Sequence, residues 1–368
     1  MRKLLFIMLS WAMWLPFYVH SDDPVPQPKI IGGIESGSSE IPWQAYLNMT
    51  FGEGANERTF ICGGVVISAD VVLTAAHCMR NGLETAKPSR VKVWAGITSI
   101  FSAGSLNAVA VHEIVLHPQY NASRFANDMA IVKLSSPLPD NAQPIRLASA
   151  DDQQRADEAF ANGWVTNGER QPNLLVSGWG STDASDASSG ATRLRQTLLS
   201  GVPDNICDSM WGANINSSEY GIFLCAGSVS PTLGRDSCFG DSGGPLVWQD
   251  PLRAADSDFG LRLVGLVSFG EGCAGRLPGV YSEVASQRSW LESEIGQGAL
   301  DQPMATFAVD PFLANYEGAG EVVDGGQSVA SGGGNSGSSG GGLGLGGLAL
   351  LVAVTWLRRR VMGQALSR

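Results

Sequence analysis

The sequence predicts an all-β domain, a barrel or a sandwich, that spans residues 30–298 and ends with one helix. Short runs rich in β-branched and aromatic residues alternate with turn residues, at the spacing typical of such folds. These runs include residues 65–67, 71–74, 91–94, 130–134, 174–176 and 263–268. Near the end of the domain, Trp290, Leu291 and Ile295 recur at helical spacing. The composition, with 44% hydrophobic and 16% charged residues, is that of a globular protein.

The segment before this domain carries export and processing signals. Residues 1–21 begin with two basic residues after the initiating Met and continue as an apolar run, which is the pattern of a secretory signal peptide cleaved after Ser21. A retained membrane anchor is the alternative, but Pro16 and the shortness of the run favour cleavage. Residues 22–29 contain three prolines, are too short and polar to pack a core, and are interpreted as a propeptide.

Cysteine usage and charge limit the chemistry that we expect. An even number of cysteines in an exported protein predicts disulfides, although six cysteines allow many pairings and the sequence alone selects none. No Cys-x-x-Cys pair is present, so we expect no metal site and no other cofactor. The net charge of −11 argues against a nucleic-acid partner and favours cationic substrates. The cysteines are Cys62, Cys78, Cys207, Cys225, Cys238 and Cys273.

One internal stretch interrupts the β pattern. Residues 149–173 are acidic and rich in Gln and Asn, with little hydrophobic periodicity. We interpret them as a long surface linker between two halves of the domain.

The strongest chemical signal is the motif Gly-Asp-Ser-Gly-Gly-Pro at residues 240–245. A serine hydroxyl is a weak nucleophile unless a base removes its proton. Glycines beside Ser242 let the backbone approach a substrate carbonyl closely, and the N–H groups of Gly240 and Ser242 can then bind the oxyanion. A Gly-rich turn without catalytic function is the alternative for this motif taken alone.

A base and an acid are available upstream of the serine. His77 lies in Leu-Thr-Ala-Ala-His-Cys, at the end of an apolar run, whereas His112 and His117 lie in an ordinary strand-and-turn stretch. Asp128 directly precedes a fully apolar run, and a partly buried carboxylate needs a partner such as an imidazole N–H. Taken singly, His77 is more typical of a structural histidine and Asp128 of a surface turn.

The order His77, Asp128, Ser242 resembles that of the trypsin/chymotrypsin family of serine proteases. The resemblance covers about residues 30–297. It includes Ile-Ile-Gly-Gly at residues 30–33, Ser-Gly-Trp-Gly at 177–180 and Pro-Gly-Val-Tyr at 278–281. It implies a serine endopeptidase in which His77 is the base, Asp128 orients it and Ser242 attacks the peptide carbonyl.

The resemblance also implies a fold of two six-stranded antiparallel β-barrels, with the cleft between them. His77 and Asp128 then come from the first barrel, and Ser242 comes from the second. The implied disulfides are Cys62–Cys78, Cys207–Cys225 and Cys238–Cys273.

Cleavage after Arg or Lys is the specificity that the resemblance implies. Asp236, six residues before the predicted nucleophile, matches the base of the family's primary pocket, where a carboxylate pairs with a substrate cation. Gly270 and Gly279 match the walls of that pocket, and Ser268 begins the strand that pairs with the extended substrate. Phe269 departs from the family, which usually has Trp there. For Asp236 alone, a solvated loop acid is the alternative.

The junction between propeptide and domain resembles the activation site of the family's zymogens. Cleavage after Lys29 frees the ammonium group of Ile30, which can enter the protein and pair with Asp241, next to the nucleophile. An activating protease is therefore an expected partner, and autoactivation is an alternative because the enzyme itself is expected to cut after Lys. A surface Lys29 that is never processed would remove this interpretation.

Two other functions fit parts of the pattern. A binding module that has lost catalysis is disfavoured because all three triad residues are present. An esterase, or a protease of chymotrypsin-like preference, keeps the same fold, but Asp236 argues against the latter. The expected substrates are thus proteins or peptides with Arg or Lys at the cleavage site.

The C-terminal sequence is interpreted as a stalk, a membrane segment and a basic tail. Residues 299–342 become rich in Gly and Ser, as in a flexible stalk. Residues 343–357 form an apolar run at the short end of what spans a bilayer. The arginine cluster that opens residues 358–368 predicts a cytoplasmic C-terminus, with the catalytic domain outside. A buried core helix is the alternative for the apolar run.

This arrangement resembles the Gly-Gly C-terminal sorting tails of bacterial secreted proteases. In that class an intramembrane rhomboid-type protease removes the tail, and the type II secretion machinery carries the product to the cell surface, so both are expected partners. A eukaryotic membrane-tethered or lipid-anchored protease is the alternative, although a lipid-anchor signal normally lacks terminal arginines. The sequence thus predicts an exported protein, tethered to the membrane before processing and then secreted or at the cell surface.

Overall fold

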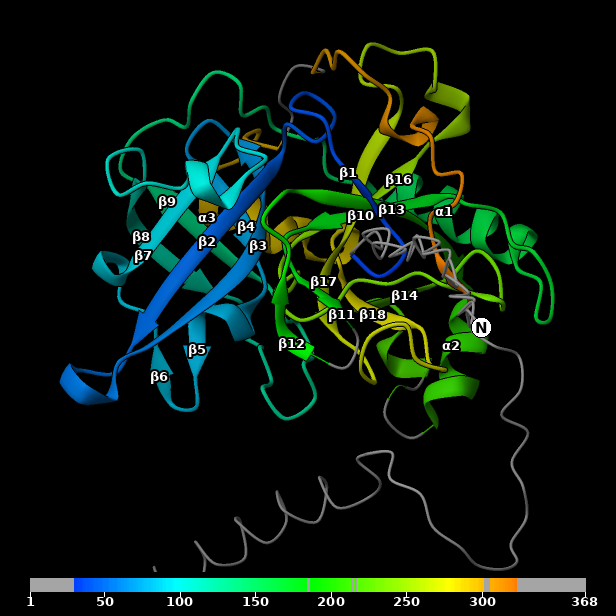
Figure 1. Ribbon diagram of the computed structural model, residues 1–368, viewed down its shortest axis with the longest axis horizontal. Coiled ribbons are helices and arrows are strands. Elements are labelled where there is room, and N and C mark those ends of the chain that lie inside the picture. Colours follow the sequence, from blue (N-terminus) through cyan, green and yellow to red (C-terminus); the bar gives the residue numbers. More distant parts are fainter. Residues whose placement is uncertain (1–29, 184–185, 213–214, 216, 301–304, 323–368) are drawn as a thin grey trace, which may run out of the picture. The chain divides into compact units, whose positions relative to one another are not determined.

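The computed structural model describes residues 30–322, apart from residues 184–185, 213–214, 216 and 301–304. The predicted signal peptide, propeptide, membrane segment and basic tail lie outside the described residues, as do residues 323–342 of the predicted stalk. The described chain forms two β-barrels packed side by side (Figure 1). Within it, no helix is long and apolar enough to cross a membrane.

The first barrel is a closed ring of six antiparallel strands. Their order round the ring is β2 (Gln44–Phe51), β3 (Arg58–Ser68), β4 (Val71–Thr74), β9 (Ala130–Leu134), β8 (Val109–Leu116) and β7 (Val91–Ala95). Along β2 the buried Leu47, Met49 and Phe51 alternate with less buried residues, because successive side chains of a strand point to opposite faces. This alternation supplies the apolar interior of the barrel.

The second barrel is closed in the same way. Its order is β13 (Arg195–Val202), β10 (Leu174–Gly178), β16 (Pro245–Gln249), β17 (Leu261–Phe269), β18 (Gly279–Glu283) and β14 (Phe223–Gly227). β14 pairs back onto β13 and closes the ring, and β1 (Ile34–Glu35) extends the sheet at β13. Two six-stranded barrels are therefore confirmed, and each of the six runs predicted from the sequence lies within a strand.

Three two-stranded sheets lie outside the barrels. They are β5 (Arg80–Asn81) with β6 (Glu84–Thr85), β11 (Ser181–Asp183) with β12 (Asp186–Gly190), and β15 (Leu233–Gly234) with β19 (Glu321–Val322). The last pair joins segments that are far apart in the sequence.

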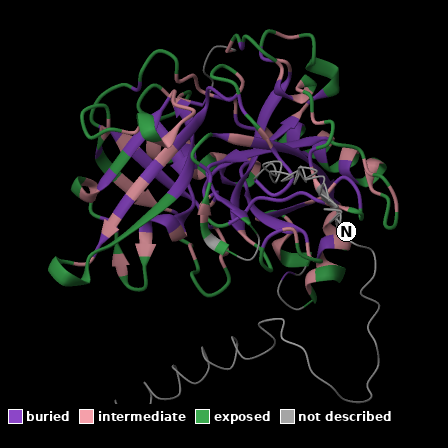
Figure 2. Ribbon diagram, viewed as in Figure 1, coloured by how far each residue is buried: buried purple, intermediate pink, exposed green. Residues whose placement is uncertain are grey.

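The core consists of the two barrel interiors and the seam between them, purple in Figure 2. The first interior is filled mainly by small, aliphatic and Met side chains, whereas the second contains larger ones such as Trp248 and Tyr281. A further cluster, which includes Trp43, Leu73 and Val247, extends across both barrels. Because burying one large apolar side chain stabilises a fold by about 1.5–3 kcal/mol, this shared cluster holds the barrels in a fixed relation.

Covalent and helical predictions are largely confirmed. The three disulfides that the resemblance implies are present, namely Cys62–Cys78, Cys207–Cys225 and Cys238–Cys273. The predicted closing helix is α3 (Arg288–Ile295), which buries Leu291. A further helix, α2 (Asp204–Trp211), carries Cys207.

The predicted linker at residues 149–173 is wrong in its first half, which forms helix α1 (Ala150–Gly163). Ser149 caps the helix: its hydroxyl accepts a hydrogen bond from the N–H of Asp152, whose carboxylate accepts one from the N–H of Ser149. Ala156 and Phe160, one turn apart, are buried in the core of the second barrel. Few residues of this helix are apolar, and the helical periodicity was therefore not apparent from the sequence.

Part of the predicted stalk is packed on the domain. Residues 305–322, here named the C-terminal strap, form the last part of the orange segment in Figure 1. Phe307 is buried against Trp43, with ring centroids 4.8 Å apart, and β19 pairs with β15 at the other end of the strap. The prediction that a flexible stalk begins at residue 299 is therefore wrong for the strap, because its aromatic side chains find apolar partners on the domain.

Candidate active site

His77 lies in a single 3₁₀ turn, Ala76–Met79, that follows β4. Its neighbour Cys78 is bonded to Cys62 on β3, which fixes the turn to the wall of the first barrel. The His77 side chain keeps 23% of its surface exposed. The ring is thus anchored on one side and open to a cavity on the other, where Ser242 also lies.

Asp128 is fully buried, and both of its carboxylate oxygens have hydrogen-bond donors. Oδ2 lies 2.7 Å from Nδ1 of His77 and accepts a second hydrogen bond from the hydroxyl of Ser268 at 2.6 Å. Oδ1 accepts from the backbone N–H of His77 at 2.8 Å, and the backbone carbonyl of Asp128 accepts from the hydroxyl of Ser282 at 3.0 Å. Since Ser268 and Ser282 belong to β17 and β18, the second barrel supports an acid that the first supplies. A carboxylate held in this way fixes the orientation of the imidazole.

The pKa of His77 is raised above its ordinary value. Burial is the largest single influence and lowers the pKa, but the charge of Asp128 and the hydrogen bond to it together raise the pKa by more. The imidazolium is therefore stabilised, as required of a base that holds a proton during a reaction.

Ser242 lies on a tight loop that both barrels hold. Its carbonyl accepts a hydrogen bond from the N–H of Gly63 on β3 at 2.9 Å, and the N–H of Gly243 donates to Val267 on β17 at 2.7 Å. Gly243 has a φ of +75°, and a Cβ there would collide with the hydroxyl of Thr74. The glycine therefore brings the serine close to the first barrel and its histidine.

Free backbone donors lie beside the serine. The N–H groups of Gly240 and Ser242 donate no hydrogen bond to any part of the chain that the structure describes. His77 and Ser242 line two cavities, of about 260 Å³ and about 300 Å³. Two unoccupied N–H groups next to a serine hydroxyl can stabilise an oxyanion.

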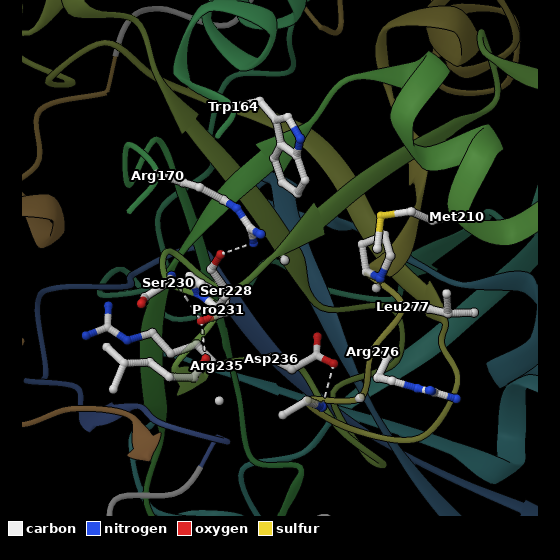
Figure 3. Close-up of a pocket in the computed structure, with 17 residues that line it drawn as sticks. Trp164, Arg170, Met210, Ser228, Ser230, Pro231, Arg235, Asp236, Arg276 and Leu277 are labelled. Atoms are coloured by element: carbon white, nitrogen blue, oxygen red, sulfur yellow. Dashed lines mark hydrogen bonds between the residues drawn. The ribbon is translucent and has the colours of Figure 1, made fainter. Parts of the chain in front are cut away.

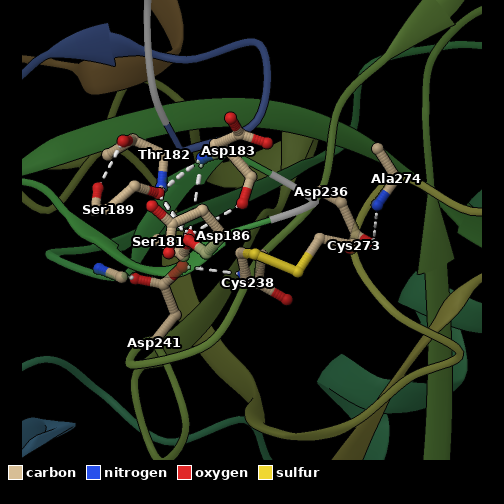
Figure 4. Close-up of a disulfide and its surroundings, with 12 residues drawn as sticks. Ser181, Thr182, Asp183, Asp186, Ser189, Asp236, Cys238, Asp241, Cys273 and Ala274 are labelled. Atoms are coloured by element: carbon tan, nitrogen blue, oxygen red, sulfur yellow. Dashed lines mark hydrogen bonds between the residues drawn. A yellow bond between two sulfur atoms is a disulfide. The ribbon is translucent and has the colours of Figure 1, made fainter. Parts of the chain in front are cut away.

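Asp236 lines the smaller of these cavities together with Gly270 and Gly279. The Asp236 side chain is 6% exposed. Its Oδ2 accepts a hydrogen bond from the N–H of Ala274 at 2.8 Å (Figure 4), whereas Oδ1 is buried without a hydrogen-bond partner among the described residues. Burial, together with the negative charge of Asp241, raises the pKa of Asp236 to about 7. Because an unpartnered buried carboxylate oxygen is unfavourable, the site is complementary to a cation.

Asp241, next to Ser242, is also fully buried. Its oxygens accept hydrogen bonds from the N–H groups of Gly180 at 2.7 Å and Cys238 at 2.8 Å (Figure 4). Burial raises the pKa of Asp241 to about 6, and within the described chain no cationic side chain pairs with it. Ile30 is fully buried as well, whereas Lys29 lies outside the described residues.

The sequence did not reveal two features of the cavity wall. Ser268, predicted only as a partner of the substrate backbone, also donates to Asp128. Phe269 packs against Phe125 and Trp211, with ring centroids 5.4 Å away in each case, and Phe125 contacts His77 at 5.6 Å. These aromatic contacts are between residues far apart in the sequence, and no local motif predicts them.

The remaining histidines and cysteines do not add a second centre to the described chain. Donor atoms of Cys62, Cys78 and His77 lie within 4.8 Å of one another, but the two sulfurs are joined in a disulfide and offer no thiolate to a metal. His112 is exposed, and His117 is buried against Trp290 at 4.6 Å.

Comparison with known proteins identifies the family of the chain. The model of the family described as Trypsin matches residues 30–291. The chain belongs to the trypsin family. Its relatives include trypsin alpha-4 of Lucilia cuprina, 36% identical over 277 residues, with 73% of this chain and 89% of the relative covered. Trypsin-3 of Salmo salar is 32% identical over 267 residues, covering 72% of this chain and 92% of the relative.

A third relative, trypsin alpha of Drosophila erecta, is 34% identical over 269 residues, covering 72% of this chain and 87% of the relative. This member of the trypsin family is accordingly a serine endopeptidase, a hydrolase that acts on protein substrates. The family match ends before the C-terminal strap, which begins at residue 305.

Proposed function

We propose that this trypsin-family enzyme is exported as a zymogen and, once cut after Lys29, hydrolyses peptide bonds that follow Arg or Lys. The observation that carries the specificity is the buried, unpartnered oxygen of Asp236, in the cavity that His77 and Ser242 also line. A substrate Arg or Lys supplies the missing donor and the counter-charge in a place shielded from water. Gly279 beside Asp236 leaves room for a long side chain.

The proposed mechanism is acyl transfer. Nε2 of His77 takes the hydroxyl proton of Ser242 while the oxygen bonds to the substrate carbonyl carbon. Asp128 holds the ring through Nδ1 and stabilises the imidazolium, and the N–H groups of Gly240 and Ser242 bind the oxyanion. The imidazolium then protonates the leaving amine as the peptide C–N bond breaks. Water, deprotonated by the same imidazole, hydrolyses the acyl-enzyme and restores the serine hydroxyl.

The specificity is tested by replacing Asp236. We expect Asp236→Ser to lower kcat/KM for Arg and Lys peptides by about 10²–10⁴-fold, because a buried substrate cation loses its partner. A matched Phe peptide should lose far less, so the Arg-to-Phe ratio is the quantity to measure. Asp236→Asn removes the charge but keeps the shape, and it controls for a change in cavity volume. A ratio that stays the same in both variants would exclude Asp236 from the substrate site.

Activation is proposed to act through Asp241. Cleavage after Lys29 creates an ammonium group on Ile30, whose side chain is fully buried. In the described chain the carboxylate of Asp241 accepts hydrogen bonds only from the N–H groups of Gly180 and Cys238, so it is available to a third, cationic partner. Pairing of the two charges orders the loop that carries Ser242, and it serves as a switch more than as a source of net stability.

Export and the fate of the tail stay predictions from the sequence, since residues 1–21 and 343–368 lie outside the described residues. We propose a cleaved signal peptide and a sorting tail that is removed after export. Intact-mass measurement of the exported protein tests both proposals at once. The expected product lacks both segments, whereas a species that still ends at Arg368 would indicate a retained anchor.

A further inference from the structure

The C-terminal strap (residues 305–322) reaches the loop that carries the proposed specificity residue. β19, at the end of the strap, pairs antiparallel with β15, with Val322 opposite Leu233 and Glu321 opposite Gly234. β15 leads directly into Arg235 and Asp236, and residues 233–236 are here named the specificity loop. Since the family match ends at residue 291, this contact belongs to a part of the chain beyond the common domain.

Arg235 ties the specificity loop to the strap through its side chain. It is 8% exposed, and its Nη2 donates a hydrogen bond to the backbone carbonyl of Ala319 at 2.8 Å. Figure 3 shows Arg235 and Asp236 pointing to opposite sides of the loop, as successive residues of an extended segment do. Anchoring the guanidinium of Arg235 on the strap therefore restricts where the carboxylate of Asp236 can point.

The strap also touches the segment that activation would free. Ile31 and Asp236 form an antiparallel bridge, in which the N–H of Asp236 donates to Ile31 at 3.2 Å. Gly32 has a φ of +66°, and a Cβ on it would lie 2.7 Å from Cα of Gly320 and would collide with the carbonyl of Gly234. The strap, the specificity loop and residues 30–33 are thus packed backbone to backbone, with no space for a side chain between them.

The other part of the strap has anchors of its own. The N–H of Phe307 donates to Ser257 at 3.0 Å, and its ring packs on Trp43. Gln249 on β16 donates a hydrogen bond from Nε2 to Oδ2 of Asp310 at 2.9 Å. These contacts hold the strap on the domain independently of its last residues, so β19 acts as a fixed support for the specificity loop.

We propose that the C-terminal strap is a positioning element of the active site, which holds the specificity loop and residues 30–33 in the arrangement that binds a substrate cation. This inference rests on the proposed function of Asp236 as the cation-binding residue. The strap contacts the specificity loop and residues 30–33 and not His77, Asp128 or Ser242, so its loss should weaken binding of the cation more than it slows the acyl-transfer step. It follows that tail processing must leave the chain intact as far as Val322 to yield an enzyme of full specificity.

The test uses the full chain, activated by cleavage, with two variants and a matched control for each. Arg235→Met removes the hydrogen bond to the strap and keeps the apolar stem. Arg288→Met, on α3, removes a hydrogen bond from Nη1 to the carbonyl of Leu147 and an ion pair with Glu292, and neither bond involves the specificity loop. Gly320→Val places a side chain against Leu233, whereas Gly318→Val introduces the same change at another positive φ with no atom within 4 Å of the new Cβ. Arg235→Lys, which keeps a donor, provides the conservative variant.

Three quantities are measured: KM for an Arg peptide, the inhibition constant of benzamidine as a small cation, and the rate of hydrolysis of a small neutral ester. We expect Arg235→Met and Gly320→Val to raise KM for the Arg peptide and the inhibition constant of benzamidine by about tenfold or more. The reason is that a hydrogen bond made by a charged group is lost or displaced. The two controls should remain within about twofold of the unsubstituted enzyme, a change of well under 1 kcal/mol. Arg235→Lys should recover part of the loss, and ester hydrolysis should change much less than cation binding in every variant.

Two results would overturn the inference. In the first, both variants behave like their controls. In the second, ester hydrolysis falls in parallel with cation binding, which would mean that the strap only supports the fold. Failure of the proposed function is distinguishable, because it would appear in the unsubstituted enzyme as no binding of benzamidine and no preference for Arg, and it would remove the inference as well.

Discussion

Buried carboxylates have different hydrogen-bond partners in two regions of this molecule. The catalytic region contains His77, Asp128 and Ser242, and the specificity region contains Asp236 and Asp241. In the catalytic region, Asp128 has a donor on each oxygen, supplied by His77 and Ser268 from the two barrels. In the specificity region, Asp236 keeps Oδ1 without a donor among the described residues, and Asp241 has only backbone N–H partners there. Burial raises the pKa of Asp236 to about 7 and that of Asp241 to about 6.

This difference in hydrogen-bond partners distinguishes a carboxylate that positions another side chain, Asp128, from carboxylates that can bind an incoming cation, Asp236 and Asp241. Asp128 is already paired with the imidazole of His77, so it holds a group that is in place before substrate binds. A buried carboxylate that has no cationic partner gains free energy when a cation arrives. On this account Asp236 receives the substrate and Asp241 receives the new N-terminus, and breaking either region should have a distinct signature.

The largest expected effect comes from Ser242→Ala, which breaks the catalytic region alone. Turnover of an Arg peptide should fall by about five to six powers of ten, because covalent catalysis is lost as a unit. Benzamidine should bind the variant as tightly as the unsubstituted enzyme, since Asp236 is untouched. Near-normal peptidase activity in the purified variant would contradict the assignment of the nucleophile.

The next effect concerns the specificity region and its dependence on activation. Lys29→Gln should remain close to background activity, because an uncut chain offers no ammonium group to the buried Asp241. Activity on an Arg peptide is measured before and after treatment with a second protease that accepts the substituted junction and cuts directly before Ile30. Matched chains that keep Lys29 serve as the control, and full activity of the uncut variant would remove Asp241 from the switch.

The smallest effect is expected for Ser268→Ala, which weakens the support of Asp128 without removing it. The hydroxyl donates to Oδ2 at 2.6 Å, and a hydrogen bond to a charged group contributes about 1.5–3 kcal/mol. We expect kcat for an Arg peptide to fall by about tenfold with KM nearly unchanged, because only the imidazolium in the transition state feels the loss. Ser282→Ala, which loses a bond to the backbone carbonyl of Asp128, provides the comparison. A rise in KM with an unchanged kcat would assign Ser268 to substrate binding alone.

The sequence predicts the catalytic region better than its surroundings. His77, Asp128 and Ser242 lie in compact motifs next to apolar runs, and each run becomes a barrel strand, so local sequence and fold agree. The hydrogen-bond donors Ser268 and Ser282 lie in no recognisable sequence motif. A serine in a strand has the same local sequence pattern whether or not it faces a carboxylate.

Helix α1 and the C-terminal strap were wrongly predicted, as a linker and a flexible stalk, because both predictions were based on amino-acid composition. Ser149 and Asp152 had the spacing of a capping box, and Ala156 and Phe160 the spacing of a helical face, but the polar composition concealed both. In the strap, Phe307 is an apolar signal overshadowed by the Gly-rich stretch that follows. Its partner Trp43 lies more than half the chain away, and only the folded structure supplies that contact.

Binding of benzamidine as a function of pH tests most directly the claim that Asp236 is a receptor for a cation. The measurement is made calorimetrically between about pH 5 and 9 on activated enzyme carrying His77→Gln, so that the histidine does not titrate. Because only the ionised carboxylate binds, affinity should be constant at high pH and fall by up to about tenfold per pH unit below the pKa of Asp236. Burial and the charge of Asp241 raise that pKa to about 7 in the uncut chain, and pairing of Asp241 with the Ile30 ammonium should lower it. The same enzyme with Asp236→Asn should bind weakly at every pH. Affinity that is independent of pH, or equal in the Asp236→Asn variant, would contradict the account.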